Sequence, residues 1–207
     1  SAANAIRAGL QQRYPGEYIC ELIDVYRRYT PFPYKYLPEL YPRWVNWARR
    51  SWGLGYWLTD APDRSRRVMA VLGHLWSRGL RRMLAEHPGD VFVCVHALFS
   101  RPTMRALRAQ PGPRPPFVTV ITDLVTVHAF WYEPEVERCL VPTPDAYTRG
   151  LAYGLSPAQL RMTGLPVHPR FLNGLPGRDE ARRILELHPT LPAVVLVGGG
   201  DGMGPVY

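Results

Sequence analysis

Residues 117–131 have the sequence Phe-Val-Thr-Val-Ile-Thr-Asp-Leu-Val-Thr-Val-His-Ala-Phe-Trp, and the rest of the chain is arranged around this stretch. Its first part, 117–121, is β-branched or apolar, and a run of this length predicts a buried strand. Polar side chains follow where that strand ends: Thr122, Asp123, Thr126 and His128, with Trp131 beyond them. Open α/β sheets place their chemistry just past the carboxyl ends of strands, so this cluster is a candidate site. The alternative is that Asp123 caps a helix and His128 is a satisfied loop residue.

The residues around this stretch alternate between helical and strand-like patterns. Apolar spacing predicts helices over 1–14, 65–87, 102–110, 145–155 and 179–187, and strands over 18–26, 90–97, 136–141, 160–163 and 193–197. The strand over 90–97 carries His96 at its end. In the helix over 65–87, the expected apolar stripe is Val68, Val71, Leu72, Leu75, Trp76, Leu80, Met83 and Leu84. This rhythm of strands and helices predicts an α/β fold with a parallel, doubly wound sheet.

The charge of the chain comes almost wholly from arginine. The net charge is +8 over 207 residues, and Lys35 is the only lysine. An arginine excess favours phosphate or anionic-surface partners, although an arginine-rich genome produces it as well. The chain is 46% hydrophobic, enough for a sizeable core in one domain or one and a half.

The cysteines predict no metal site and no disulfide framework. Cys20, Cys94 and Cys139 are odd in number, each lies beside apolar residues, and their spacing is not that of metal ligands. We therefore expect buried free thiols in a reducing compartment. No apolar run approaches the ~18 residues of a membrane span, and no signal peptide opens the chain. The chain starts without Met in a helical pattern and stops just after a Gly-rich loop, so both ends look cut.

Residues 27–57 interleave aromatic rings with cations. The rings are Tyr29, Phe32, Tyr34, Tyr36, Tyr41, Trp44, Trp47, Trp52, Tyr56 and Trp57, and the cations are Arg27, Arg28, Lys35, Arg43, Arg49 and Arg50. A membrane interface selects this combination, and so does a surface that stacks and clamps single-stranded nucleic acid. The third interpretation is an irregular helical segment whose aromatics pack on the core. Prolines at 31, 33, 38 and 42 exclude one uninterrupted amphipathic helix.

A glycine-rich loop follows the last predicted strand. Residues 198–204 are Gly-Gly-Gly-Asp-Gly-Met-Gly. Backbone N–H groups in such a loop form a phosphate cradle when a helix follows. The spacing is neither that of a Walker A loop nor a strict G-x-G-x-x-G, so a tight turn is the alternative.

Three motifs in this order resemble one family. They are Thr-Asp-Leu-Val-Thr-Val-His-Ala-Phe-Trp at 122–131, Gly-Leu-Pro-Val at 164–167 and Gly-Gly-Gly-Asp-Gly-Met-Gly-Pro at 198–205. The chain is similar in them to the monogalactosyldiacylglycerol synthase family, which includes processive diacylglycerol glycosyltransferases. The opening residues, 1–6, also resemble the first helix of that family. The resemblance covers nearly the whole chain.

The resemblance implies a GT-B fold, in which two Rossmann-like domains face a cleft. Residues 1–165 then form the acceptor- and membrane-binding domain, 166–177 the interdomain linker and 178–207 the start of a truncated UDP-sugar-binding domain. Family members carry a histidine in a Gly-rich loop before the first helix, and this chain starts just after that loop. Most of the donor domain also lies outside this sequence, so we expect a fragment.

The implied reaction transfers galactose or glucose from a UDP-sugar to diacylglycerol, with inversion and without a cofactor or metal. A base must then act on the acceptor hydroxyl, and charge on the leaving diphosphate must be stabilised. We expect Asp123 or His128 to orient or deprotonate the hydroxyl, with Asp123 fixing the imidazole tautomer; the family's loop histidine is a rival base. His96, Thr126 and Trp131 are expected on the acceptor side. The expected diphosphate cradle comprises Gly198, Gly199, Gly200, Gly202, Met203 and Gly204.

Because the implied acceptor is dissolved in a membrane, the enzyme must bind that membrane. We therefore expect residues 27–57 to act as a peripheral anchor on anionic lipid. The expected partners are the UDP-sugar, diacylglycerol and an anionic membrane surface, without nucleic acid, at the cytoplasmic side of a membrane. Two other functions stay open. One is a UDP-GlcNAc transferase acting on a lipid-linked cell-wall precursor, and the other is a nucleic-acid-binding module that uses 27–57 for stacking.

Overall fold

The computed structural model describes residues 1–195, apart from the side chain of Arg49. The chain divides into two compact units. Residues 20–166 form one, and the other contains residues 3–19 and the chain from 167 onward. The expected glycine cradle over 198–204 lies outside the described residues.

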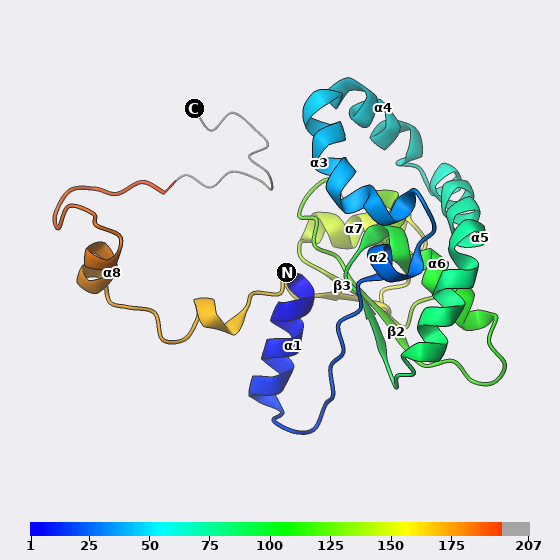
Figure 1. Cartoon of the computed structure of the whole chain (residues 1–207), viewed down its shortest axis with the longest axis horizontal. Helices are drawn as coiled ribbons and strands as arrows, with labels where there is room; N and C mark the ends of the chain where they lie inside the picture. Colours follow the sequence, from blue (N-terminus) through cyan, green and yellow to red (C-terminus); the bar gives the residue numbers. More distant parts are fainter. Residues whose placement is uncertain (196–207) are drawn as a thin grey trace. The chain divides into compact units, whose positions relative to one another are not determined.

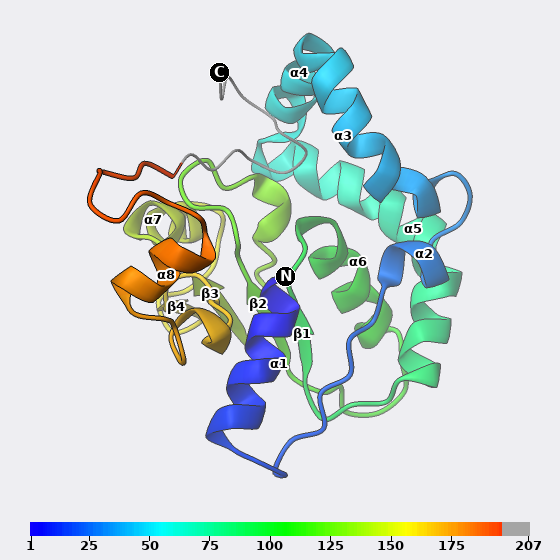
Figure 2. The same ribbon diagram turned by 60° about the vertical axis from the view of Figure 1, so that its left-hand side comes forward.

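A four-stranded parallel sheet lies at the centre of the unit 20–166 (Figures 1 and 2). Its strands are β1 (Phe92–Cys94), β2 (Phe117–Val120), β3 (Arg138–Val141) and β4 (Leu160–Met162), in the order β1-β2-β3-β4. All neighbours pair in parallel, and Thr119 of β2 lies between Cys94 and Cys139. The predicted α/β class with a parallel sheet is confirmed, and the stretch at 117–121 supplies an inner strand.

Three helices pack against this sheet or against one another: α5 (Pro62–Glu86), α6 (Ala97–Arg108) and α7 (Pro144–Ala152). Helix α6 begins at Ala97, before the expected 102, because the His96 ring accepts a hydrogen bond from the Leu98 N–H and caps the helix. The shared core includes Trp76, Leu80, Leu107, Phe117, Ile121, Val127, Val141 and Leu160.

The buried face of α5 differs from the predicted stripe. Val71 and Leu75, which were expected in the core, are 61% and 47% exposed. Trp76, Leu80, Met83 and Leu84 are buried as predicted, and Ser65, Met69 and Gly73 complete the buried face. The cause is that α6 packs against the side of α5 that carries the small residue Gly73. A Cβ placed on Gly73 would lie 3.7 Å from the Pro102 Cα of α6, so the two helices approach closely along the glycine side.

The strand predicted over 18–26 is wrong. Residues 18–24 have no regular structure, and Ile19 is fully exposed. An alternating pattern becomes a strand only beside a pairing partner, and none of the four described strands pairs with this segment. Helix α2 (Val25–Tyr29) then begins, because an Asp24 carboxylate oxygen accepts a hydrogen bond from the Arg27 N–H at 3.1 Å.

The aromatic segment 27–57 is not one helix, as predicted, but its breaks follow the prolines only in part: Pro31 and Pro33 lie between α2 and η1, whereas Pro38 and Pro42 lie within α3. It forms α2, the 3-10 turn η1 (Tyr34–Tyr36) and the helices α3 (Leu37–Trp47) and α4 (Arg49–Thr59). The interpretation that its aromatics pack on the core holds for Tyr29, which is 2% exposed, but is wrong for Trp47 and Trp57, which are 92% and 65% exposed. Helices α3 and α4 contact each other, and α4 also contacts α5.

The other unit contains α1 (Ala2–Arg13), the 3-10 turn η3 (Pro169–Phe171) and α8 (Arg178–Ile184). The helices predicted over 1–14 and 179–187 are confirmed, and the Ser1 hydroxyl caps α1 by accepting from the Asn4 N–H. Of the strand predicted over 193–197, residues 193–195 have no strand structure and the rest lies outside the described part. Among the described helices, none has the length and apolar character needed to cross a bilayer.

Candidate active site

The loop after β2 brings Asp123 and Trp131 together. The Trp131 indole N–H donates to Asp123 Oδ2 at 2.8 Å, across the short 3-10 turn η2 (Ala129–Trp131). The Trp131 ring is 4% exposed, so it is part of the core and only its N–H reaches the carboxylate. Asp123 itself is half-buried at the carboxyl end of the sheet. This hydrogen bond leaves the second carboxylate oxygen of Asp123 available to a ligand.

His128 lies in the same loop but is turned away from this pair. Its ring is 6% exposed, and Nδ1 accepts from the Phe130 N–H at 3.1 Å. Nδ1 therefore carries no proton, and Nε2 does. Nε2 lies 3.3 Å from the Tyr56 carbonyl oxygen and 3.1 Å from Thr59 Oγ1. Both ring nitrogens are thus engaged, and this conformation favours the satisfied loop residue over a base. Its catalytic role stays a prediction.

Burial lowers the pKa of His128, and the attraction of the Asp60 carboxylate opposes this only in part. The unfolded chain takes up a proton below an ordinary pKa of about 6.5, whereas the folded chain keeps this ring neutral to lower pH. The unfolded state then binds more protons, so the free energy of unfolding falls as the pH falls below about 6.5.

We expect acidification from about pH 7 to pH 5 to lower the thermal midpoint of the complete protein, and His128→Gln to reduce this fall. The measurement is the thermal midpoint against pH for both proteins. His74→Gln, on the exposed side of α5, is the matched control and should follow the parent. Parallel curves for the parent and His128→Gln would contradict the assignment.

His96 ends the neighbouring strand and caps α6. Its Nδ1 accepts from the Leu98 N–H at 3.3 Å, which leaves the proton on Nε2, and the Tyr26 ring stands edge-on to the imidazole at 5.2 Å. Desolvation of the ring by neighbouring protein groups lowers the pKa of His96. The negative charge of Asp123 opposes this shift by favouring the protonated ring. The residue as a whole is exposed. His96 and Asp123 therefore follow the carboxyl ends of the adjacent strands β1 and β2.

Thr126 contributes its backbone to the site geometry. Its carbonyl oxygen accepts from the Tyr56 hydroxyl at 2.6 Å, and its side chain is exposed. The Tyr56 ring also stands edge-on to the His128 ring, with centroids 4.6 Å apart. The end of α4 thus holds the middle of the loop.

Sequence patterns missed the residues that hold this loop in place. Asp60 Oδ1 accepts from the Ala129 N–H at 2.9 Å, and its other oxygen pairs with Arg149 of α7 at 2.5 Å. Thr143, the cap of α7, donates to the Leu124 carbonyl oxygen at 2.6 Å. These partners lie 19 to 89 residues apart in sequence, so no local signal could have found them.

The cysteines and carboxylates form no metal centre in the part that the structure describes: no three His, Cys, Asp or Glu side chains come close enough to hold an ion. Cys139 is buried, and burial raises the pKa of its thiol to about 12. Cys20 and Cys94 are half-buried free thiols.

Residues 1–167 match the sequence family described as monogalactosyldiacylglycerol (MGDG) synthase. That match includes the sheet, the loop after β2 and every described site residue. The chain belongs to the monogalactosyldiacylglycerol synthase family. The resemblance seen in the motifs at 122–131 and 164–167 is thereby confirmed.

Curated relatives match over all 207 residues of the chain. A probable monogalactosyldiacylglycerol synthase of Glycine max chloroplasts is 35% identical, and the match covers 39% of that protein. Chloroplast MGDG synthases of Arabidopsis thaliana and Spinacia oleracea are 33% and 32% identical, with 39% and 40% of their lengths covered. The chain thus spans about two fifths of these MGDG synthases.

Proposed function

We propose that the complete protein containing this chain transfers a hexose from a UDP-sugar to diacylglycerol, and that this chain supplies the acceptor side of the active site. The observation that carries the proposal is the match of the whole chain to MGDG synthases, with Asp123 and His96 placed at the carboxyl ends of adjacent strands. The names of the relatives favour galactose. We propose 1–165 as the acceptor domain, 166–177 as the linker and 178–207 as the start of the donor domain.

In this reaction the glycerol hydroxyl attacks the anomeric carbon, its proton leaves, and the bond to the UDP diphosphate breaks with inversion. The oxygen of Asp123 that is not bonded to Trp131 is placed to orient the hydroxyl or accept its proton. We propose His96 as the second group facing the acceptor and Thr126 as part of the wall that holds it, with Trp131 acting through its hydrogen bond to Asp123. Backbone amides over 198–204 would stabilise the departing diphosphate.

The test is transfer of labelled sugar by the complete protein to diacylglycerol in anionic vesicles, with UDP-galactose and UDP-glucose in parallel. Product from either donor supports the proposal and identifies the hexose. A third assay offers UDP-GlcNAc and a lipid-linked cell-wall acceptor. Product in that assay alone would replace the proposal with the cell-wall alternative.

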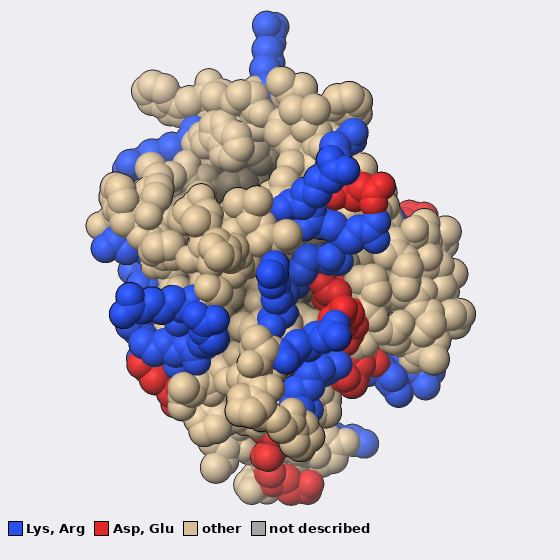
Figure 3. Space-filling model, turned by 90° about the vertical axis from the view of Figure 1, so that its right-hand side faces the viewer, with Lys and Arg blue, Asp and Glu red and all other residues tan. Residues whose placement is uncertain are grey.

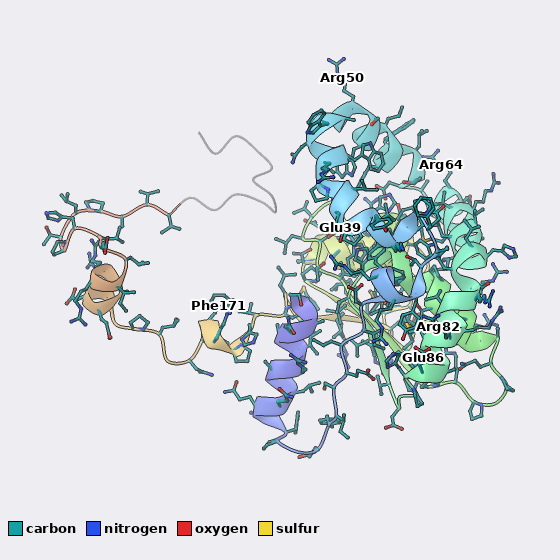
Figure 4. The ribbon with its side chains drawn as sticks, viewed as in Figure 1. Glu39, Arg50, Arg64, Arg82, Glu86 and Phe171 are labelled. Atoms are coloured by element: carbon teal, nitrogen blue, oxygen red, sulfur yellow. The ribbon has the colours of Figure 1, made fainter. Side chains whose placement is uncertain are left out.

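We further propose that α3 and α4 dock on an anionic membrane surface. Their exposed apolar side chains form what we term the docking face: Leu40, Tyr41, Trp44, Trp47, Leu54, Trp57 and Leu58. Figure 3 shows this end of the molecule largely free of charge, with basic side chains below it over α5 and acidic side chains beside them. Arg50 projects from the tip (Figure 4), where a lipid phosphate can pair with it. Rings at the headgroup level and arginines on phosphates support a peripheral mode of binding.

The double variant Trp47→Ala/Trp57→Ala is expected to weaken vesicle binding by at least about tenfold, because both rings lose apolar burial in the interface. Binding of the parent should rise with anionic lipid and fall with salt. The measurement is co-sedimentation of the complete protein with vesicles. Val71→Ala/Leu75→Ala removes exposed apolar groups from α5 and is the matched control.

Two outcomes would contradict the docking face. Equal losses in both double variants would show that apolar exposure in general, and not this face, drives binding. Preference of the parent for single-stranded oligonucleotides over vesicles would favour the stacking alternative for Trp47 and Trp57.

A further inference from the structure

Helix α4 has two sides with different surroundings. Leu54, Trp57 and Leu58 are exposed on one side and belong to the docking face. Tyr56 and Thr59 lie on the other side, and Asp60 ends the helix. Because side chains three and four positions apart share a face of a helix, the sequence 54–60 separates an outer side from a side that contacts the loop 122–131.

The inner side of α4 holds the loop 122–131 at successive points. The Tyr56 hydroxyl donates to the Thr126 carbonyl oxygen at 2.6 Å. Asp60 Oδ1 accepts from the Ala129 N–H at 2.9 Å, at the start of η2. At the other end of η2, the Trp131 indole N–H donates to Asp123. A short turn therefore links the residue held by Asp60 to the residue that holds Asp123.

Asp60 joins three elements. While Oδ1 holds η2, Oδ2 pairs with Arg149 of α7 at 2.5 Å, and the Asp60 side chain is only 18% exposed. The Asp60 carboxylate is thus fixed by the Arg149 cation and by the Ala129 amide. A movement of the end of α4 would therefore displace η2. Tyr56 adds a second hold near the middle of the loop.

Helix α4 is itself weakly held. None of its described side chains is buried, although it carries Trp52, Leu54 and Trp57. A helix with little buried apolar surface belongs to the low-stability end of a structure. A surface that covers its outer side would therefore restrict its motion, and the hydrogen bonds of its inner side would pass this restriction to the loop.

We propose that Tyr56 and Asp60 are positioning residues that couple docking of α4 on an anionic lipid surface to the ordering of residues 122–131 around Asp123. This inference rests on the proposed function, since it assigns a purpose to the docking face within the same reaction. It adds to that function a means by which the enzyme gains order at its acceptor site when it reaches the membrane.

The test is hydrogen exchange of the complete protein with and without vesicles of mixed zwitterionic and anionic phospholipid. In the parent, vesicles should slow exchange of the amides in 122–131 by about tenfold. This is the factor expected when docking stabilises the closed state of the loop by the net contribution of about one hydrogen bond. Tyr56→Phe and Asp60→Asn should lose most of this difference while binding the same vesicles. The matched controls are Asp63→Asn, whose exposed carboxylate pairs with nearby Arg66, and Tyr18→Phe, whose ring is exposed.

The outcomes separate this inference from the proposed function. Equal exchange of 122–131 with and without vesicles in the parent would overturn it, whatever the activity. Loss of vesicle binding in Tyr56→Phe would also overturn it, because that residue would then belong to the docking face. If the parent makes no glycolipid but shows the exchange difference, the coupling stands and the reaction is wrong. With an active parent, Tyr56→Phe should lower kcat about fivefold to tenfold with the acceptor KM unchanged.

Discussion

Replacement of Asp123 by asparagine is expected to lower kcat of the complete protein by about 10² to 10⁴-fold, the usual loss when a group that takes a proton is removed. The substitution is well matched to the geometry. Trp131 donates to one oxygen of Asp123 at 2.8 Å, and the amide oxygen of asparagine accepts the same bond. The loop should therefore keep its shape while the site loses its negative charge and its basicity.

The measurement is steady-state transfer of labelled sugar to diacylglycerol, with the thermal midpoint recorded in parallel. Asp90→Asn, in the exposed turn between α5 and β1, makes the same chemical change away from the site and should leave kcat unaltered. If Asp123→Asn turned over at the parent rate, Asp123 would have no part in proton transfer. The family's loop histidine would then be the leading candidate for the base.

Local sequence patterns correctly predicted those structural elements whose formation depends mainly on their own residues. The apolar run at 117–121 became β2 because a β-branched segment buried on both faces has one stable arrangement in a parallel sheet. The polar residues after β2 lie at the carboxyl edge of the sheet. His96 lies at the same edge, after the neighbouring strand β1, because parallel strands end at the same edge. The candidate residues therefore lie at one edge of one sheet, while their roles stay predictions.

The sequence patterns did not predict features that depend on how several elements pack together. The periodicity of α5 allows a buried face through Val71 and Leu75 as readily as one through Met69 and Gly73. The choice was made by α6, which approaches the glycine side. The strand pattern at 18–26 needed a partner that none of the described strands supplies.

Asp60 illustrates the same limit at the site. It lies between α4 and α5, and no sequence motif marks it. In the structure it holds Ala129 and Arg149, which lie 69 and 89 residues away. Likewise, Asp123 was expected to fix the tautomer of His128 within the implied reaction. In the structure Asp123 instead accepts from Trp131, and the His128 ring turns toward the end of α4.

Gly79→Ala is expected to reduce the free energy of unfolding by about 3 kcal/mol or more, although alanine is the better helix former by roughly 1 kcal/mol. Gly79 lies within α5, and a Cβ at this position would stand 1.8 Å from the Tyr29 carbonyl oxygen. That contact is with backbone, so no side-chain rotation relieves it. One of the two helices, α2 or α5, has to move.

The end of α2 is poorly able to move, because several contacts fix Tyr29 and its neighbour. Tyr29 is 2% exposed, its hydroxyl donates to Glu86 at 2.6 Å, and Arg82 donates to the Arg28 carbonyl oxygen at 2.9 Å. Displacing α2 would break these bonds and open the core around Trp76. The steric cost therefore exceeds the gain in helix propensity, and the sign of the effect is set by packing.

Gly73→Ala is the matched control in the same helix. Its Cβ would meet Pro102 at 3.7 Å, an ordinary van der Waals distance, so we expect a change between zero and a gain of about 1 kcal/mol. Chemical denaturation of the complete protein, followed by tryptophan fluorescence, measures both variants. Similar stability changes in the two would mean that α2 does not rest on α5 at Gly79. A large loss confined to Gly79→Ala would establish this close approach as the contact that seats α2, the helix from which the chain continues into α3 and the docking face.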